Sequence, residues 1–324
     1  MRVCFAADVI TDDQHWRYLD EILYGVDDGW HEWEVDDPDA LEQSEWLSGT
    51  NRSFIRELFE KAAKAGVYPN TLHKRRYFVS MQSGADSMPP QAAARYFRRP
   101  LFVCGENQFT DGIFLNALLA TLSPPELQSF LAQSQGNPIE ADHAGGAGEL
   151  YKRIEWRISE SALIGIPFRA IVFTDSDARF PGHEERKPLQ IADLCQQHNI
   201  DCLVIGKRSI ENYIPDEVLR GWANEPGNRA WRELVEIVCR LTAEQRDHLP
   251  MKKRLPLQFD TPQETALYAS VPTQDLDLLK NRHFDNKIIT ILETHRQYLT
   301  ADGLRARDGK GELDSLITMI IEAL

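Results

Sequence analysis

Three acidic residues in this 324-residue chain stand where they could hold a cation. Glu106 follows the apolar run 101–104 and one glycine, and Asp175 and Asp177 follow the largely apolar segment 169–173 and one threonine. Carboxylates at positions i and i+2 raise each other's pKa unless a cation neutralises them. Carboxylate oxygens are the ligands that Mg²⁺ and Mn²⁺ prefer. One or two such ions could polarise a phosphate, activate water and stabilise a leaving oxygen, which is the chemistry of phosphodiester cleavage.

The segments around these acids alternate between strands and helices. Strands are expected at 101–104, 138–141, 169–173 and 202–205, and helices at 110–122, 149–161 and 189–198. Thr110 is the expected N-cap of the first helix. This order predicts a parallel sheet with right-handed crossovers. The loops after parallel strands gather at one edge, so the three acids, the turn at 145–146 and the segment 207–211 are expected to converge.

The flanking regions have different patterns. Residues 1–90 predict a mixed segment, with strands at 2–6, 31–35 and 76–81 and helices at 14–23 and 54–65. Beyond residue 224 the chain is expected to be helical, with amphipathic stretches at 229–241, 287–298 and 313–324. We therefore predict an N-terminal α/β region at 1–95, a catalytic α/β domain at 96–223 and a helical C-terminal region at 224–324.

Two segments resemble motifs of the Toprim family. The segment 101–119, LFVCGENQFTDGIFLNALL, is similar to the first Toprim motif, in which an apolar strand ends near Gly-Glu and leads into a helix. The segment 171–177, IVFTDSD, is similar to the second motif, a strand that ends in D-x-D. The phrase 207–215, KRSIENYIP, resembles the segment after the last Toprim strand in nucleases of the OLD (overcoming lysogenisation defect) family. The resemblance covers residues 100–220 and implies a Toprim-like parallel sheet flanked by helices.

The resemblance also implies roles for the acids. Glu106, Asp175 and Asp177 would be catalytic and would bind Mg²⁺ or Mn²⁺, with Glu106 also available as a general base. Asp111 would be a further metal ligand, because OLD-type sequences place an acid shortly after their glutamate. In OLD-type sequences the two acids are one residue closer together than Glu106 and Asp111 are here. Asn107 is therefore an alternative match for the glutamate position.

The segment after the last predicted strand would complete the site. By the resemblance, Lys207 or Arg208 would neutralise the phosphate in the transition state. Glu211 would order this loop or complete a second metal site. The Gly-rich turn 144–148 lacks the G-x-x-x-x-G-K-[ST] pattern of a nucleotide-binding loop. OLD proteins carry an ATPase on the same chain, so any ATPase here is expected on a separate subunit.

Basic residues with aromatic neighbours suggest nucleic-acid binding. Arg75 and Arg76 belong to one such cluster, Arg98 and Arg99 to a second, and residues 252–254 form a third. Lysine and arginine neutralise backbone phosphates, and aromatic rings can stack on unpaired bases. We expect the four arginines to contact nucleic acid.

The net charge of −14 is concentrated in one region. Residues 1–60 hold 16 acidic and 4 basic residues, a net charge of −12, and the remaining residues hold 34 and 32, a net charge of −2. The acidic region would repel DNA, so we expect it to lie away from Glu106 and to dock on a basic partner. Five scattered cysteines indicate neither a disulfide framework nor a zinc site. No apolar run is long enough to span a membrane, and we expect a cytoplasmic protein.

These observations predict a metal-dependent nuclease, with DNA as the expected substrate and bacterial anti-phage defence as the expected setting. Two alternatives stay open. One is a non-catalytic Toprim module that scaffolds a DNA-bound assembly. The other is a phosphatase similar to the haloacid dehalogenases, whose D-x-D motif would make Asp175 a nucleophile.

Overall fold

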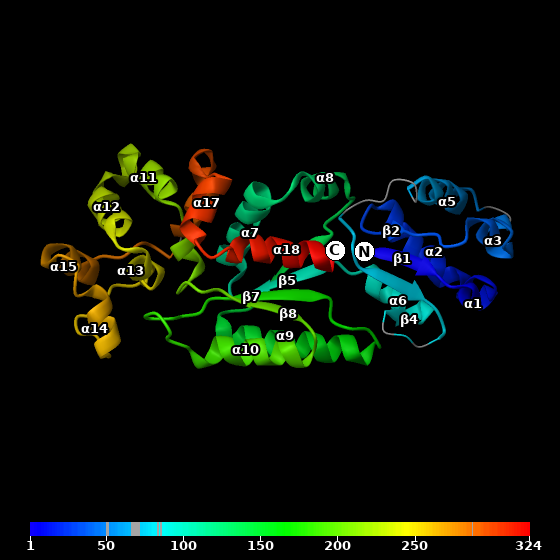
Figure 1. The fold of residues 1–324 in the computed structure, drawn as a ribbon, viewed down its shortest axis with the longest axis horizontal. Coiled ribbons are helices and arrows are strands. Elements are labelled where there is room, and N and C mark those ends of the chain that lie inside the picture. Colours follow the sequence, from blue (N-terminus) through cyan, green and yellow to red (C-terminus); the bar gives the residue numbers. More distant parts are fainter. Residues whose placement is uncertain (50–51, 66–71, 83, 85, 287) are drawn as a thin grey trace.

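The computed structural model describes residues 1–49, 52–65, 72–82, 84, 86–286 and 288–324. Within these residues the strands form two four-stranded parallel sheets. The central sheet has the order β6-β5-β7-β8, with β5 at Leu101–Gly105, β6 at Ile139–His143, β7 at Ala170–Thr174 and β8 at Asp201–Val204. The N-terminal sheet lies at one end of the elongated molecule and the helical C-terminal region at the other (Figure 1). The α/β fold with parallel sheets flanked by helices confirms the predicted fold class.

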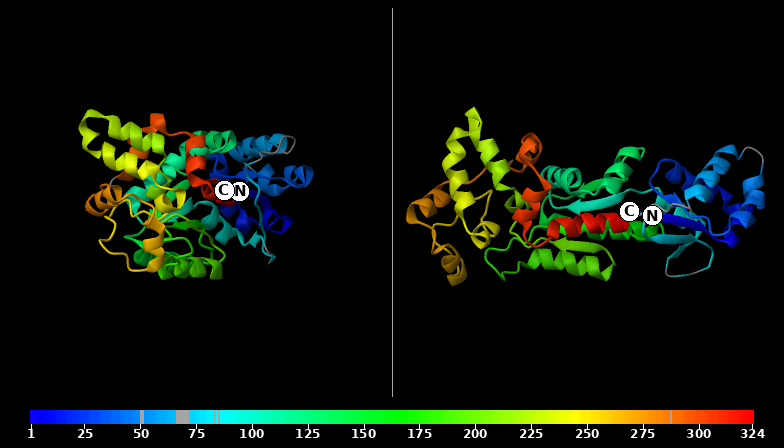
Figure 2. Two further views of the ribbon diagram at one scale, coloured as in Figure 1. Left: turned by 60° about the vertical axis from the view of Figure 1, so that its left-hand side comes forward. Right: turned by 45° about the horizontal axis from the view of Figure 1, so that its top comes forward.

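Side chains alternate across the central sheet because successive strand residues point to opposite faces. Leu101 and Val103 pack with α7 (Gln108–Leu122) and α18 (Glu312–Ala323) on one face. Phe102 and Cys104 pack on the other face with α9 (Ala147–Leu163) and α10 (Arg186–Gln197). α18 lies along the sheet in Figure 1 and in the right-hand view of Figure 2. Both faces are covered, as parallel sheets require.

The N-terminal sheet has the order β2-β1-β3-β4 and its own hydrophobic core. Its elements are β1 (Arg2–Phe5), α1 (Ala7–Ile10), α2 (Asp13–Asp27), β2 (Glu32–Trp33), α3 (Pro38–Glu42), α4 (Glu45–Ser48), α5 (Ser53–Ala65), β3 (Arg76–Val79), β4 (Ser87–Met88) and α6 (Pro90–Phe97).

This N-terminal unit meets the segments that precede the central strands. Trp30 Nε1 donates to Gln135 O at 2.6 Å, ahead of β6. Arg169, directly before β7, donates to Arg99 O at 2.9 Å, directly before β5. Glu106 follows the opposite end of β5. The acidic N-terminal unit therefore lies at the amino end of the central sheet, away from Glu106 (Figure 1).

Most of the C-terminal helices lie beyond the carboxyl end of the central sheet, whereas α18 runs back along one face of the sheet (Figure 1). They comprise α11 (Asp216–Asn224), α12 (Arg232–Arg240), α13 (Ala243–Asp247), α14 (Pro262–Tyr268), α15 (Thr273–Asn281), α16 (Ile291–Thr294), α17 (Ala301–Asp308) and α18, with 3₁₀ turns η1 (Ile210–Tyr213), η2 (Pro226–Trp231), η3 (Ile288–Thr290) and η4 (Arg296–Tyr298). One hydrophobic cluster joins these helices to the α7 face of the sheet. In the described part of the chain, no helix is long and apolar enough to cross a membrane.

The structure differs from the sequence-based description in three local features. Thr110 is not the N-cap of α7, because the helix begins earlier and Asn107 Oδ1 accepts from the backbone N–H groups of Phe109 and Thr110. The short elements β4, α6 and α8 (Pro125–Gln133) occupy segments for which no helix or strand was predicted. The helix expected at 287–298 is divided into η3, α16 and η4, because Ile288, Ile289 and neighbouring residues are buried consecutively and cannot share one helical face. Residue 287 lies outside the described residues.

Candidate metal-binding active site

Glu106 is held against the end of the neighbouring strand β7. Its Oε1 accepts a hydrogen bond from Thr174 Oγ1 at 2.5 Å and another from the backbone N–H of Asp175 at 3.1 Å. Among the described residues Oε2 has no hydrogen-bond donor. The backbone carbonyl of Glu106 accepts from Gly146 N at 2.9 Å, so the glycine turn after β6 also reaches this edge. The side chain of Asn107 is used to cap α7. Of the two candidates for the glutamate position, Glu106 is therefore the one whose side chain lies next to the acids that follow β7.

Asp111 lies in the first turn of α7, four residues after Asn107, and its side chain packs onto Gly105. Its Oδ2 accepts from Asn107 N at 3.0 Å and its Oδ1 from Thr110 Oγ1 at 3.0 Å. A Cβ at Gly105 would lie 2.6 Å from Asp111 Oδ2, so only glycine allows this approach. Asp111 therefore fastens the start of α7 beside Glu106 as well as adding a carboxylate to the site.

The D-x-D loop is tied to the segment after β8. Asp175 Oδ1 accepts from Ile210 N at 3.0 Å, and Ser176 Oγ donates to Lys207 O at 2.7 Å. Asp177 adopts a left-handed backbone with φ of 52°, and its N–H donates to Arg208 O at 3.0 Å. Left-handed non-glycine residues are uncommon and gather at functional sites. The serine between the two acids thus has a structural role, since it joins the two loops.

Glu211 is the most deeply buried acid at this edge. It is 0% exposed, and Lys252 Nζ lies 2.9 Å from its Oε1. Among the described residues its Oε2 has no hydrogen-bond partner. A buried carboxylate is costly unless it is paired, so Lys252 is the cation that this part of the structure provides.

The pKa shifts show that these acids share one electrostatic environment. Burial raises the pKa of Glu106, and the charges of Asp111 and Asp177 raise it further. Burial likewise raises the pKa of Asp175 well above its ordinary value, with added contributions from Glu211, Glu106 and Asp111. Burial and the Glu211 carboxylate raise the pKa of Asp111, although its hydrogen bonds oppose this. Five acids predicted from the sequence therefore lie within electrostatic reach of one another.

Lys252 responds to the same carboxylates. Burial lowers its pKa, but the negative charges of Glu211, Asp175 and Asp111 outweigh burial and raise the pKa above the ordinary lysine value. The sequence placed Lys252 only in a basic cluster. Its role at the site was missed, and the basic run 252–254 was the available signal.

The structure does not bring Lys207 to the acids. Its side chain is buried, and Nζ pairs with Asp247 Oδ1 at 2.7 Å. Burial and the nearby Arg307 lower the pKa of Lys207, although Asp247 opposes them. The expected phosphate-neutralising role does not suit a lysine that is held in this way, because its ammonium already faces Asp247.

The segment Glu211–Tyr213 holds the chain that leads to Lys252 in place. Asn212 Nδ2 donates to Arg246 O at 2.6 Å and to Leu249 O at 2.9 Å. Tyr213 OH hydrogen bonds to Glu312 at the start of α18. Glu211 therefore faces the acids while its two neighbours anchor α13 and α18.

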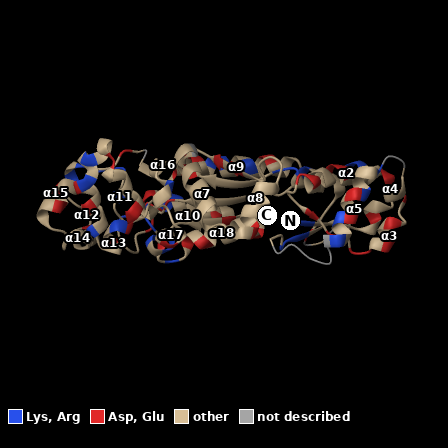
Figure 3. Ribbon diagram, turned by 90° about the horizontal axis from the view of Figure 1, so that it is seen from above, with Lys and Arg blue, Asp and Glu red and all other residues tan. Residues whose placement is uncertain are grey.

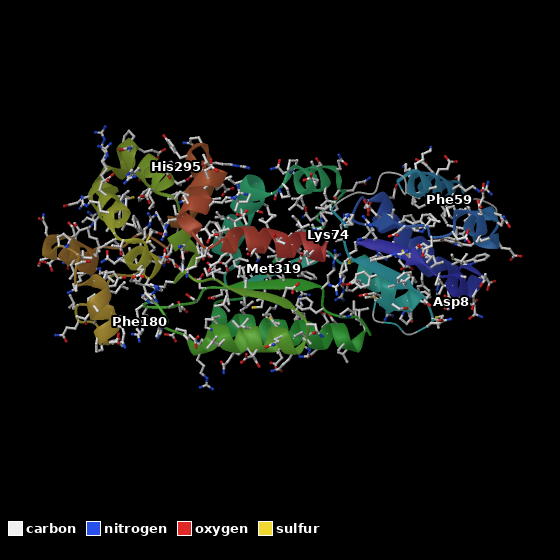
Figure 4. The ribbon with its side chains drawn as sticks, viewed as in Figure 1. Asp8, Phe59, Lys74, Phe180, His295 and Met319 are labelled. Carbon is white, nitrogen blue, oxygen red and sulfur yellow. The ribbon has the colours of Figure 1, made fainter. Side chains whose placement is uncertain are left out.

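The four predicted nucleic-acid arginines lie away from this edge. Arg98 and Arg99 precede β5, at the amino end of the sheet, and Arg98 lies 3.8 Å from Glu21. Arg75 lies over the Tyr77 ring, and Arg76 begins β3 in the N-terminal unit. Figure 4 labels Phe180, in the loop after β7, and Lys74, ahead of β3, near opposite ends of the central sheet. Sequence proximity to Glu106 was misleading because β5 separates the arginines from it.

One cluster of potential metal ligands in the described residues is compact but already contains a cation. Cys4, Glu34 and Asp36 each offer an atom within 4.8 Å of the others. Arg76 binds all three: Nε donates to Cys4 Sγ at 3.1 Å, and Nη2 contacts Glu34 at 3.3 Å and also Asp36. We therefore assign this cluster to Arg76 rather than to a metal.

The acids around Glu106 suit a hydrated divalent ion. In the described residues, no three of them bring one oxygen each within 4.8 Å of one another. Mg²⁺ keeps several waters and takes only one or two direct carboxylate ligands, so this spacing is compatible with it. The unpartnered Glu211 Oε2 and the raised pKa values of Glu106 and Asp175 indicate a deficit of positive charge. The donor set therefore fits Mg²⁺ or Mn²⁺.

Metal-free stability should depend on pH through Asp175. Its raised pKa means that the folded state binds this proton more tightly than the unfolded chain does. The free energy of unfolding therefore falls as pH rises from the unfolded pKa of about 3.9 to the folded pKa. Asp175→Asn removes this dependence, so its stability advantage over wild type should grow with pH. Urea unfolding in EDTA at several pH values measures it, with Asp193→Asn, an exposed acid on α10, as control. A pH-independent difference would contradict the assignment.

No protein-family model, curated protein or solved structure matches the chain.

Proposed function

We propose that this protein is an Mg²⁺- or Mn²⁺-dependent nuclease that hydrolyses phosphodiester bonds. The proposal rests on one observation. Five acids that the sequence predicts from separate segments lie close enough at the carboxyl edge of a parallel sheet to shift one another's pKa values, and Lys252 lies beside them. Such edges are where parallel α/β folds place their ligands. Three or more clustered carboxylates need cations before they can approach a phosphate.

Each group has a role that its surroundings support. One or two of Asp175, Asp177 and Glu211 would bind the hydrated metal directly and the others through its waters, and Asp111, which also fixes α7, would add a further water-mediated contact. The metal would supply a Lewis acid that polarises the phosphate and acidifies water. Glu106, held at Oε1, would use Oε2 to orient a water and accept its proton.

Lys252 replaces Lys207 as the cation in this proposal. Its ammonium lies 2.9 Å from Glu211 and is stabilised by Asp175 and Asp111. A positive charge fixed beside the acids would stabilise charge that develops on the phosphate.

The geometry favours a metal site over the phosphatase alternative. A nucleophilic Asp175 would be expected to have few competing acids around it. Instead, the carboxylates of Glu211, Glu106 and Asp111 all contribute to raising its pKa. A purely scaffolding module would have no need for this costly arrangement of carboxylates.

We further propose DNA as the substrate and a separate ATPase as the partner, in a cytoplasmic anti-phage system. The support is the separation of charge. The acidic N-terminal unit lies at the end of the central sheet opposite the acids, where it can meet a basic partner without repelling DNA at the site (Figure 1). The sequence motifs that resemble OLD nucleases suggest the kind of partner.

Plasmid nicking tests the proposed function. Wild-type protein should convert supercoiled plasmid to nicked or linear forms with Mg²⁺ or Mn²⁺ and lose this activity in EDTA. Cleavage that is undiminished by EDTA would reject the proposal. If an ATPase gates the enzyme, Mn²⁺ and the purified partner are added before an inactive result is accepted.

DNA affinity should depend on the basic residues next to Lys252 rather than on the predicted arginines. Lys253 and Arg254 are exposed and directly follow it. Lys253→Glu/Arg254→Glu should weaken DNA binding about tenfold or more and flatten its salt dependence. The matched control, Arg98→Glu/Arg99→Glu, should change neither. Fluorescence anisotropy at several salt concentrations gives the DNA affinity of each double variant and its dependence on salt. A larger effect of Arg98→Glu/Arg99→Glu would return the DNA contact to Arg98 and Arg99.

A further inference from the structure

A cavity lies in the N-terminal unit, remote from Glu106. It has a volume of about 700 Å³ and is lined by residues that follow β1 and β2 together with residues of α2, α3 and α4. It therefore occupies the carboxyl edge of the N-terminal parallel sheet, the edge where parallel α/β units place ligands. The proposed nuclease chemistry does not use this cavity.

Aromatic side chains form one wall of the cavity. Phe5, Trp16 and Trp33 line it, and the Phe5 and Trp33 ring centroids are 5.5 Å apart. Trp46 is fully buried beneath them and packs edge-on against Phe5 at 5.6 Å. The guanidinium of Arg52 lies 5.9 Å from the Trp16 ring, so this wall already accepts a cation on one side. A cavity of about this size with apolar and aromatic walls is typical of small-molecule sites.

Carboxylates form the polar part of the lining. These are Glu34, Asp36, Asp37 and Glu45, and no Lys, Arg or His lines the cavity among the described residues. Arg76 pairs with Asp36 and with Glu34 Oε1, but Glu34 Oε2 has no partner among the residues described. Asp37 caps α3.

Glu45 is the acid whose charge is most available to a ligand. Its side chain is exposed and makes no hydrogen bond or ion pair with any described residue. The cavity therefore has more negative charge than Arg76 can balance. In Figure 3 acidic residues gather at the end of the molecule formed by α3 and α4.

We propose that this cavity binds a small organic cation with an aromatic body. The rings would bury the aromatic body and attract the positive charge, and Glu34 and Glu45 would bind the ammonium. An anion of the same shape would meet four carboxylates and be excluded. The inference stands independently of the nuclease proposal, since it uses no residue of the Glu106 edge.

Tryptamine and indole-3-acetate provide a matched test, since they share a ring and differ in charge. Calorimetry with the full chain should detect tryptamine at millimolar concentration and not indole-3-acetate. Glu34→Gln/Glu45→Gln should weaken tryptamine binding about tenfold or more, and Glu45→Gln alone should weaken it less. Glu42→Gln removes a charge from α3 outside the cavity lining and should change affinity by less than about twofold.

Three results would overturn the inference: no tryptamine binding by the wild-type chain, equal binding of indole-3-acetate, or unchanged affinity in both Glu45 variants. Circular dichroism confirms that the variants fold. If Glu34→Gln unfolds the unit by releasing Arg76, Glu45→Gln alone decides the outcome, because the exposed Glu45 side chain makes no hydrogen bond or ion pair with any described residue.

Discussion

Glu106→Gln is expected to lower metal-dependent cleavage at least about a thousandfold, equivalent to about 4 kcal/mol of transition-state stabilisation. The amide keeps the shape of the side chain and can still accept from Thr174 and Asp175 N at its oxygen. It cannot accept a proton from water, and it removes one negative charge from the metal site. The fold should survive, so the loss should appear in kcat rather than in the unfolding midpoint. Initial rates of plasmid nicking measure it.

Glu140→Gln is the matched control for this variant. Glu140 is exposed on β6 of the same sheet, before the carboxyl edge. It should cleave at the wild-type rate. Near-normal cleavage by Glu106→Gln would show that Glu106 has no catalytic role, because no other described carboxylate accepts from both Thr174 Oγ1 and Asp175 N between β5 and β7.

Lys252→Met should destabilise the metal-free protein by about 3–5 kcal/mol, since it leaves a buried Glu211 without its cation. Methionine retains much of the apolar stem, so the loss reports mainly on charge. Adding Glu211→Gln should recover most of the stability. Urea unfolding in EDTA gives the three free energies, and the double-mutant cycle gives the coupling between the two side chains.

Lys253→Met serves as the control, because Lys253 is exposed and its substitution should cost less than about 0.5 kcal/mol. Equal effects at positions 252 and 253 would mean that Lys252 does not neutralise Glu211. A double variant no more stable than Lys252→Met would lead to the same conclusion.

The strand ends were predictable, and the contributions from distant helices were not. Leu101–Gly105 and Ala170–Thr174 carry their own signal, an apolar segment followed by an acid, and that signal is local. The parallel sheet then brings the acids together through its topology. Lys252 carries no such signal. Its position depends on Asn212 holding the carbonyls of Arg246 and Leu249, a contact between segments far apart in sequence.

The expectations that the geometry does not support have related physical causes. Thr110 and Asn107 are both good N-caps, and only the backbone shows which one begins α7. Lys207 was assigned to the phosphate because it follows β8, but Asp247 from α13 takes its ammonium. The arginines at 98 and 99 lie close to Glu106 in sequence but are separated from it by the length of β5.

The packing of α18 also affects how the chain can fold as it is synthesised. α18 covers β7 and α7, yet roughly 140 residues separate it from the end of β7, which is of the order of ten seconds of translation. During that interval Leu101, Val103 and Ile171 lack part of their apolar cover. Non-local contacts of this kind slow folding and prolong exposure of apolar surface. A ribosome-bound chain that stops before α18 should therefore bind more chaperone than the released protein does. It should also be cleaved faster by added protease.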